Sequence, residues 1–385
     1  MIDFFTDNKN LIIIKGDRMQ YRKFGNTWYK VSMLGFGAMR LPMLPDGTVD
    51  FDKATEIIRY AIEHGVNFID SHHFYHNGQS EEAIGRAIKG FPREKLIIQT
   101  KIGMYNNYTD QQCWQLLETA LKKLDTDYID FYLTHSLRWE TYLKHNKQFM
   151  NFTQKAMDQK LIRHRGFSVH DSVENMKKII NTGEFSAMTV QYNLLYRESQ
   201  EAIALAHERG LGVVVMGPVG GGTFGYPGET LLSWIERKEK STAALALKFV
   251  LSNPDVDVAI SGMSTLQQVM ENIETVSNFS PLTKDEIKKI DEIFQSRKKL
   301  LNLYCTGCRY CMPCPNNVNI PSNFHWYNVA IVYGVEKRAH DGYFALKPEQ
   351  RASACTGCGR CEEKCPQKIP IREKMKEVAK YFEKK

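Results

Sequence analysis

The sequence lacks an apolar run of the roughly 18 residues that a membrane-spanning helix requires. The nearest, "LIIIK" at residues 11–15, is far too short, and the opening "MIDFFTD" lacks the basic character of a secretory signal. No nucleic-acid-binding motif is found along the chain. These absences predict a cytoplasmic protein that has neither a membrane nor a nucleic acid as its partner.

Cysteine is scarce outside two short runs. Eight of the nine cysteines lie between Cys305 and Cys314 or between Cys355 and Cys365. Two-residue gaps suit metal ligation, and a cytoplasmic setting argues against disulfides. The ninth, Cys113, stands in a helical stretch, and we expect it to be a small buried apolar residue.

Composition predicts a folded chain with a large and a small domain. The 385 residues are 43% hydrophobic and 25% charged, which is ordinary for a packed core. The net charge is +7, and residues 301–385 hold 14 Lys and Arg against 8 Asp and Glu, so +6 of it lies there. Such an excess of basic residues is usually interpreted as a charged surface exposed to solvent. A docking surface for an acidic partner is the alternative interpretation.

Short β-branched or aromatic runs alternate with helical periodicity after an expected hairpin at 19–32 that turns at Gly25 and Asn26. Eight such runs are found, at 33–39, 66–70, 95–101, 128–135, 161–168, 187–193, 212–217 and 256–262. Eight βα units predict an α/β fold, a closed (β/α)8 TIM barrel. An open doubly wound sheet is disfavoured, because "LGFGAMR" lacks the GxGxxG turn.

Three regions are predicted along the chain. Residues 19–300 form the barrel and end in an amphipathic helix over 282–300, while residues 301–385 form a small, mainly α, ferredoxin-like iron–sulfur domain. Residues 1–18 have no role in the barrel pattern, and "GDR" before Met19 can be encoded by a sequence resembling a ribosome-binding site. We therefore expect Met19 to be the natural start.

Polar residues close three consecutive strands of the predicted barrel. Asp70, Lys101 and His135 follow apolar runs, and Tyr75 comes five residues after Asp70. Catalytic residues of such barrels lie at these strand ends. The set fits carbonyl reduction, in which hydride addition leaves an oxygen that needs a proton. A tyrosine can donate it when an ammonium stabilises the tyrosinate, and a histidine can orient the carbonyl.

"FIDSHHFYHNGQSEEAIG", "IIQTKIG" and "DYIDFYLTHSL" resemble the signature of the aldo-keto reductase family, over roughly residues 19–300. The resemblance implies that Tyr75 is the proton donor, that Lys101 and Asp70 tune it, and that His135 orients the substrate. It also implies a bound nicotinamide, NADP or NAD, without a Rossmann domain, and a small-molecule carbonyl or alcohol as substrate.

The resemblance also implies cofactor-binding residues. Ser168 in "GFSV" and Gln191 in "VQYN" match the carboxamide-binding positions, although Val169 replaces the usual Asn. Met216 stands where many members stack an aromatic ring on the nicotinamide. "GMSTLQQVMEN" matches the adenosine-phosphate loop and its helix, through Gly262, Ser264, Gln268 and Asn272. Gln268 replaces an Arg that is common in NADPH-preferring members, which argues against strict NADPH preference.

The second cysteine run has the spacing C-x2-C-x2-C-x3-C-P, a pattern of bacterial ferredoxins. Because the fourth Cys of such a run ligates the other cluster, two [4Fe–4S] clusters are predicted. Their metal ligands are Cys305, Cys308, Cys311 and Cys365 for one, and Cys355, Cys358, Cys361 and Cys314 for the other. Two structural zinc sites are the alternative. Barrel and tail together resemble a ferredoxin-containing subgroup of the aldo-keto reductases.

The sequence is compatible with three functions. The first is NAD(P)-dependent reduction of an aldehyde or ketone by hydride transfer, with clusters that are structural or shape the site. The second is an electron-transfer oxidoreductase whose clusters relay electrons from a ferredoxin or other carrier to a barrel-bound cofactor, such as a flavin. The third is a redox-sensing module with a non-catalytic barrel. His72, His73 and His76 are expected to line the substrate pocket or to be solvated, and a metal site is the alternative.

Overall fold

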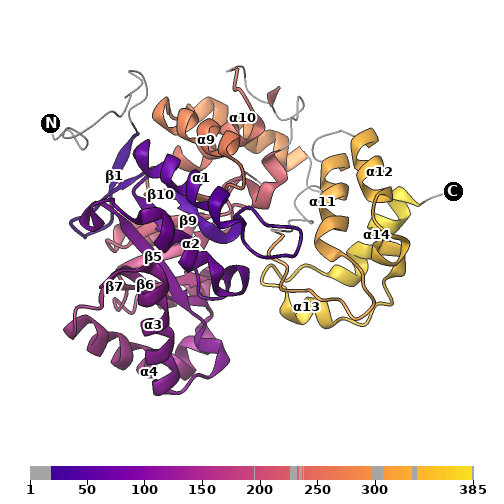
Figure 1. The fold of residues 1–385 in the computed structure, drawn as a ribbon. Helices are drawn as coiled ribbons and strands as arrows, with labels where there is room; N and C mark the ends of the chain where they lie inside the picture. The colour runs from indigo at the N-terminus through magenta and orange to yellow at the C-terminus, as the bar shows by residue number, and fades with distance from the viewer. Residues whose placement is uncertain are drawn as a thin grey trace.

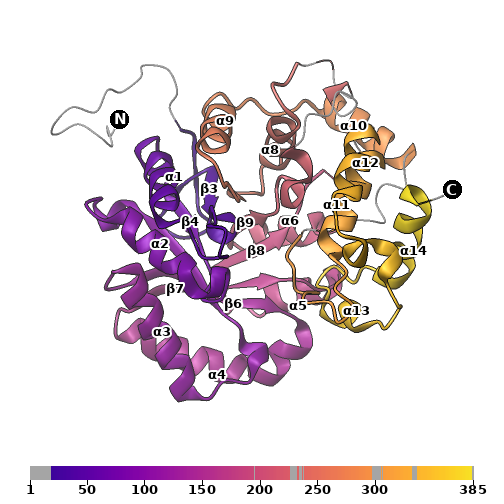
Figure 2. The same cartoon turned by 45° about the vertical axis from the view of Figure 1, so that its right-hand side comes forward.

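The computed structural model describes residues 19–194, 196–225, 232–233, 236, 238–296, 305, 307–331 and 336–383. The expectation that Met19 is the natural start concerns residues 1–18, which lie outside the described residues. Among the described helices, none is long and apolar enough to cross a membrane. Figures 1 and 2 show a barrel with a smaller helical domain beside it.

Eight parallel strands close the barrel in the order β10-β3-β4-β5-β6-β7-β8-β9, which confirms the predicted (β/α)8 fold. Most of their residues are buried, as strands covered on both faces require. The strands are β3 (Leu34–Gly37), β4 (Phe68–Asp70), β5 (Ile97–Ile102), β6 (Ile129–Leu137), β7 (Ile162–Val169), β8 (Ala187–Gln191), β9 (Gly212–Met216) and β10 (Val258–Ser261).

Helices cover the outside of the barrel, and side chains cap several of their first turns. Asp50 accepts from the backbone N–H of Lys53 before the first helix, and Thr109 forms a capping box with Gln112 before the third. These helices are α1 (Phe51–Glu63), α2 (Gln79–Ile88), α3 (Asp110–Leu124), α4 (Trp139–Asp158), α5 (Val173–Ile180), α6 (Gln200–Glu208), α8 (Thr242–Leu251), α9 (Leu266–Ser277) and α10 (Lys284–Ser296).

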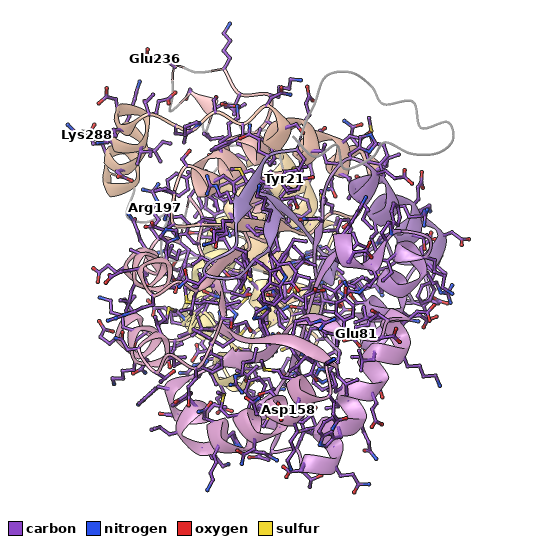
Figure 3. All side chains as sticks on the ribbon, turned by 90° about the vertical axis from the view of Figure 1, so that its left-hand side faces the viewer. Tyr21, Glu81, Asp158, Arg197, Glu236 and Lys288 are labelled. Atoms are coloured by element: carbon purple, nitrogen blue, oxygen red, sulfur yellow. The ribbon has the colours of Figure 1, made fainter. Side chains whose placement is uncertain are left out.

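The predicted hairpin exists and closes the amino end of the barrel. Strands β1 (Tyr21–Lys23) and β2 (Lys30–Ser32) pair antiparallel, and Figure 3 shows them in front, with Tyr21 labelled. Phe24 is fully buried against the rings of Phe68 and Phe131. A Cβ at Gly25 would lie 2.4 Å from the backbone nitrogen of Gly212, so the turn can approach the barrel only with glycine there.

The cysteine-rich domain is mainly helical, as predicted. It contains α11 (Ile320–Ile331), α12 (Glu336–Phe344), α13 (Arg360–Lys364) and α14 (Ile371–Phe382). The aromatic spacer between the two cysteine runs and the last helix, α14, together supply its core. Tyr343 stacks on Phe382 with ring centroids 4.2 Å apart, and Phe324 and Met375 are buried beside them. The ninth cysteine, Cys113, is fully buried in the barrel domain, as the sequence predicted.

Candidate active site and cysteine centres

The structure brings the four predicted catalytic residues together at the carboxyl end of the barrel. Asp70 is the last residue of β4, Lys101 is the last but one of β5, and His135 stands two residues before the end of β6. Lys101 and Asp70 form a buried ion pair. The Nζ atom of Lys101 lies 5.5 Å from the centre of the Tyr75 ring. Tyr75 thus faces an ammonium that a carboxylate holds in place.

Hydrogen bonds fix this ion pair. The Lys101 ammonium also donates to the backbone oxygen of Ser71, at 2.7 Å, and Gln99 donates to the Asp70 carboxylate at 2.6 Å. Burial lowers the pKa of Lys101, and the Asp70 charge opposes that shift. Removing Asp70 would therefore leave a buried cation without its counter-charge.

His135 is buried, and its surroundings keep it neutral. Burial lowers its pKa well below the ordinary value of 6.5, and the positive charge of Lys101 acts in the same direction. Its ring lies 4.1 Å from that of His72, centre to centre. Its Nε2 atom is 3.2 Å from the hydroxyl of Tyr310, which belongs to the cysteine-rich domain. A neutral imidazole here can donate a hydrogen bond without bringing a second positive charge.

The three neighbouring histidines are held by the protein. His72 is 1% exposed, so solvation is ruled out for it. His73 contacts the backbone oxygen of Lys101 through Nδ1 at 2.9 Å, and His76 accepts from the backbone of Leu41 at 3.2 Å. Among the residues that the structure describes, no three His, Cys, Asp or Glu side chains converge as a single metal ion would require.

We expect the free energy of unfolding to fall as the pH is lowered from about 7 to about 5. Burial lowers the pKa of His72, His135 and His170, the last to about 4, while unfolded histidines titrate near 6.5. Below 6.5 the unfolded chain therefore binds more protons, and each excluded proton costs about 1.4 kcal/mol per pH unit. Urea denaturation followed by tryptophan fluorescence measures this.

His170→Asn should make that dependence shallower, whereas the same change at the exposed His340 should leave it unaltered. A free energy of unfolding that does not change between pH 7 and pH 5 would contradict the assignment of buried neutral histidines.

The predicted nicotinamide-binding residues lie at the ends of three adjacent strands. Ser168 is in β7, and Gln191 and Met216 are the last residues of β8 and β9, where they are paired in register. Ser168 and Gln191 are buried, and Met216 is half-buried. The Ser168 hydroxyl accepts from the backbone N–H of Ser136 at 2.8 Å. The three side chains therefore stand at the same edge as the predicted catalytic set.

The predicted adenosine-phosphate residues surround the start of α9. Gln268 accepts from the backbone N–H of Ser264 at 2.8 Å, so its amide stabilises the loop before the helix. Asn272 is buried and donates to the hydroxyl of Ser261 at 3.1 Å, which ties α9 to β10. Gly262 needs to be glycine, because a Cβ there would lie 2.5 Å from Cγ of Arg40.

Arg40 is a residue that the sequence did not single out. It ends a short 3-10 helix, η1 (Ala38–Arg40), directly after β3. Its backbone oxygen accepts from the Ser264 hydroxyl at 2.6 Å, and its guanidinium donates to the backbone of Gly307 at 3.3 Å. Burial lowers its pKa, and the thiols of Cys308 and Cys305 oppose that shift. Arg40 is thus a half-buried cation between the predicted adenosine-phosphate loop and the first cysteine run.

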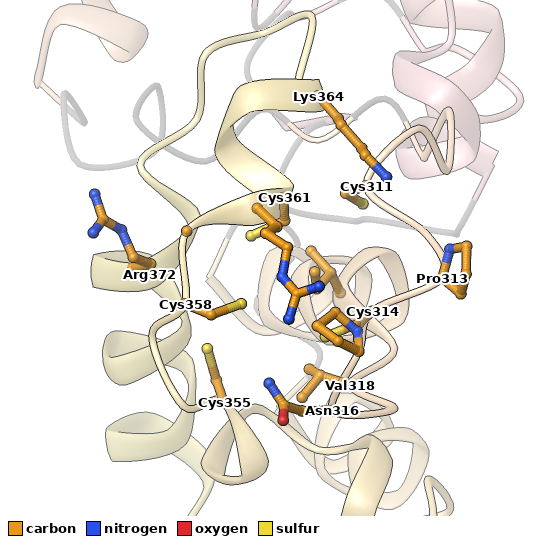
Figure 4. A pocket seen from close by; sticks show the side chains of 14 residues that line it. Cys311, Pro313, Cys314, Asn316, Val318, Cys355, Cys358, Cys361, Lys364 and Arg372 are labelled. Atoms are coloured by element: carbon orange, nitrogen blue, oxygen red, sulfur yellow. The ribbon is translucent and has the colours of Figure 1, made fainter.

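Five cysteines of the two runs line one cavity of about 270 Å³. Figure 4 shows the side chains of Cys355, Cys358 and Cys361 around its middle, with Cys314 of the first run across from them. Burial is the main cause that raises the pKa of Cys305 and of Cys311, each to about 12. The charge of Cys365 adds to both shifts, which places Cys365 near the first run. The last cysteine of each run therefore stands beside the other run.

Among the described residues, three polar contacts join the cysteine-rich domain to the carboxyl end of the barrel. They are the pairs of Arg40 with Gly307, His135 with Tyr310, and His170 with Gln367, the last at 3.3 Å. Each barrel partner stands at or just after the carboxyl end of a strand. The domain therefore lies against the edge where the predicted catalytic residues stand. The sequence carried no signal for these partners, because they join residues up to 267 positions apart.

Comparison with known proteins assigns a family to each of the two domains. The model of the aldo/keto reductase family matches residues 33–295, and a 4Fe-4S dicluster domain matches residues 304–370. The probable aldo-keto reductase 1 of Glycine max is 25% identical over 72% of this chain and 89% of its own length. The NADH-specific methylglyoxal reductase of Escherichia coli is 25% identical over 66% and 92%.

Among solved structures, the holo form of an aldo-keto reductase from Bacillus halodurans superimposes with a TM-score of 0.62. It is 27% identical and covers 71% of this chain and 96% of its own. The barrel and the cysteine-rich domain are each covered by one of the two family matches. The chain belongs to the aldo/keto reductase family of oxidoreductases and carries a ferredoxin-type 4Fe-4S domain at its C-terminus.

Proposed function

We propose that the protein reduces an aldehyde or ketone to an alcohol with NAD(P)H, and that Tyr75 donates the proton. The observation that carries this proposal is the buried ion pair of Lys101 with Asp70, whose ammonium faces the Tyr75 ring. An ammonium at this place stabilises the tyrosinate that remains after the proton has left. The ion pair therefore supports the chemical step.

His135 orients the substrate in this proposal. It is buried and neutral at the strand end beside Lys101, so it can hydrogen-bond the carbonyl oxygen and hold it toward Tyr75. A neutral donor suits this task, because a second cation beside Lys101 would weaken the ammonium's hold on its own proton.

The nicotinamide cofactor, when bound, supplies the hydride. Ser168 and Gln191 would hold its carboxamide, since their polar side chains stand at adjacent strand ends, and Met216 would contact its ring. Gly262, Ser264, Gln268 and Asn272 would hold the adenosine end. Arg40 adds a cation beside that loop.

Gln268→Arg should lower the KM for NADPH relative to the KM for NADH by about 10- to 100-fold. An Arg at this exposed position can bind the 2′-phosphate through charge-assisted hydrogen bonds, each worth roughly 1.5–3 kcal/mol. Steady-state KM values for both cofactors measure the effect. Gln267→Arg, one residue away on the same helix, is the matched control. Equal changes for NADH and NADPH in Gln268→Arg would contradict the assignment.

For the second domain we propose two [4Fe–4S] clusters with crossed ligands, within domain limits of 19–300 and 301–385. Cys305, Cys308, Cys311 and Cys365 hold one cluster, and Cys355, Cys358, Cys361 and Cys314 hold the other. The position of Cys314 beside the second run, and of Cys365 beside the first, supports this. A cavity of about 270 Å³ among thiols suits a polynuclear cluster better than a single zinc ion.

A second candidate function is electron relay between the clusters and the barrel site. The contact of Tyr310 with His135 favours it, because Tyr310 lies between two proposed ligands, Cys308 and Cys311. Nicotinamide passes two electrons as hydride and a cluster passes one, so a relay needs an adapter such as a flavin. Its partner would be a ferredoxin or a similar carrier. The complete catalytic set weighs against a purely sensing role.

The experiment that tests the first proposal is an anaerobic screen of NADH and NADPH oxidation over a panel of aldehydes and ketones. Turnover of at least one carbonyl by the purified chain is the expected result. Turnover that requires reduced ferredoxin, with none from either nicotinamide, would favour the relay function instead.

A further inference from the structure

The polar contacts between the two domains gather around one of the two proposed cluster positions. In the cysteine-rich domain these contacts are made by Gly307, Tyr310 and Gln367. Each of the three stands within two residues of a ligand proposed for the first cluster, namely Cys308, Cys311 and Cys365 in that order. None of them stands beside a ligand proposed for the second cluster. The first cluster position therefore lies on the barrel side of the domain.

The second cluster position opens to solvent instead. The cavity of about 270 Å³ is lined by all four of its proposed ligands, Cys314, Cys355, Cys358 and Cys361. Every described residue that lines this cavity belongs to the cysteine-rich domain, so no described part of the barrel closes it. Cys358 is exposed, whereas the other seven cysteines of the two runs are half-buried or buried. One position therefore meets the barrel and the other meets water.

Positive charge surrounds the open position. Among the described residues that line the cavity there is no carboxylate, and there are three exposed cations, Arg360, Lys364 and Arg372. Figure 4 shows Lys364 above the cysteine side chains and Arg372 to their left. Arg372 is paired with Glu362 at 2.9 Å, whereas Arg360 and Lys364 form no ion pair within the described part of the chain. Most of the net charge of this basic rim therefore comes from Arg360 and Lys364.

Cations next to thiolates can also serve only to balance the thiolate charge. Hydrogen bonds from Arg360 lower the pKa of Cys358, so part of the basic rim does act on a proposed ligand. At the first position the comparable cation, Arg40, is held in the domain interface through its bond to Gly307. A cation needed only for balance can be covered in that way. The exposed side chains of Arg360 and Lys364 instead stay accessible to the carboxylates of another protein.

We propose that the basic rim of Arg360, Lys364 and Arg372 is the docking surface for an acidic one-electron carrier protein, which exchanges electrons with the second cluster position. The inference rests on the proposed clusters and on the relay function above. The carrier gives up one electron, a [4Fe–4S] cluster at this position is reduced by one electron, and no bond forms or breaks. The first position then stands between the docking surface and the proposed catalytic residues.

Binding of an acidic 2[4Fe–4S] ferredoxin to the full, anaerobically purified chain tests this inference. Both proteins are kept oxidised, and isothermal titration calorimetry gives the dissociation constant at low and at high salt. Wild type should bind the ferredoxin, and should bind it more weakly as the salt concentration rises, because salt screens contacts between exposed charges.

Arg360→Gln combined with Lys364→Gln should weaken this binding at low salt by about 3- to 20-fold, the effect of losing two exposed charge contacts. Lys347→Gln combined with Lys380→Gln is the matched control. It removes the same charge from exposed positions of the same domain that do not line the cavity, and it should bind like wild type. Iron content equal to that of wild type shows that the variants keep their clusters.

A measurement on the wild-type complex needs no variant. A carbodiimide joins a lysine amine directly to a carboxylate in contact with it, and mass spectrometry of the digested complex locates the joined pair. Lys364 should be the main position joined to the ferredoxin, while Lys347 and Lys380 should carry no cross-link. This readout decides the inference even where the variant of Arg360 and Lys364 loses iron.

The outcomes separate this inference from the proposed function. Wild type that does not bind the ferredoxin at low salt, or cross-links that avoid Lys364, would overturn the docking surface. A variant of Arg360 and Lys364 that keeps both its iron and wild-type affinity would overturn it too, since the cations would then serve the thiolates alone. Carbonyl reduction by NAD(P)H is measured without any carrier, so its failure is seen separately. A chain purified anaerobically without iron would overturn the proposed clusters.

Discussion

Tyr75→Phe should lower kcat for carbonyl reduction by about 10²- to 10⁴-fold, the usual contribution of a positioned proton donor. The phenyl ring keeps its contact with the Lys101 ammonium, whose Nζ lies 5.5 Å from the ring centre, so the fold and the ion pair are preserved. Only the transferable proton is removed. The measurement is single-turnover oxidation of NAD(P)H with a carbonyl that the wild-type chain reduces.

Two further measurements make this result specific. Binding of NAD(P)H, followed by the quenching of tryptophan fluorescence, should equal that of wild type, because Tyr75 acts on the substrate oxygen. Tyr60→Phe makes the same chemical change in α1, where Tyr60 stacks on His64, and should leave kcat unaltered. If Tyr75→Phe turned over every carbonyl at the wild-type rate, another residue would have to supply the proton.

The second large effect concerns iron content. Cys314→Ala and Cys355→Ala should each remove about half of the iron, because each takes one ligand from the same proposed [4Fe–4S] cluster. Combining the two changes should remove no more than either alone. Cys314→Ala combined with Cys305→Ala should remove nearly all of it, since these two residues serve different clusters although they share a run.

The opposite pattern would show that each run holds its own cluster. In that case Cys314→Ala with Cys305→Ala would lose half of the iron, and Cys314→Ala with Cys355→Ala would lose nearly all. Cys113→Ala is the control, because this buried thiol lies in the barrel domain, and burial raises its pKa to about 11. Iron analysis of anaerobically purified protein measures each variant.

Much of the fold could be predicted from the sequence, since its determinants are local. The alternation of buried strands with amphipathic helices predicted the barrel, because parallel strands covered on both faces consist of short apolar runs. The proposed catalytic residues were predicted from the same alternation, since they stand at the ends of its apolar runs. Asp70, Lys101 and His135 each close or nearly close such a run, and the barrel topology brings consecutive strand ends together.

The exact strand ends were less predictable. The sequence placed the last residue of the fourth barrel strand at His135, whereas β6 continues to Leu137, with an irregular register between Thr134 and Leu137. The expected last helix of the barrel, 282–300, begins two residues later, at Lys284, and its predicted end falls on residues 297–300, which lie outside the described residues. Strand and helix ends depend on hydrogen bonds to neighbouring elements, which a local apolar pattern does not encode.

The sequence was sufficient to predict the barrel, the proposed catalytic set and a ferredoxin-type domain, because each depends on residues that are close along the chain or on a repeating unit. Packing of distant segments sets the contact of Tyr310 with His135 across 175 positions and the place of Arg40 between the barrel and the first cysteine run. It also buries His72, whose Nε2 has no hydrogen-bond partner within the described residues. Such contacts arise where two separately patterned surfaces pack together. Each surface has its own periodicity, and neither periodicity specifies how the two surfaces dock.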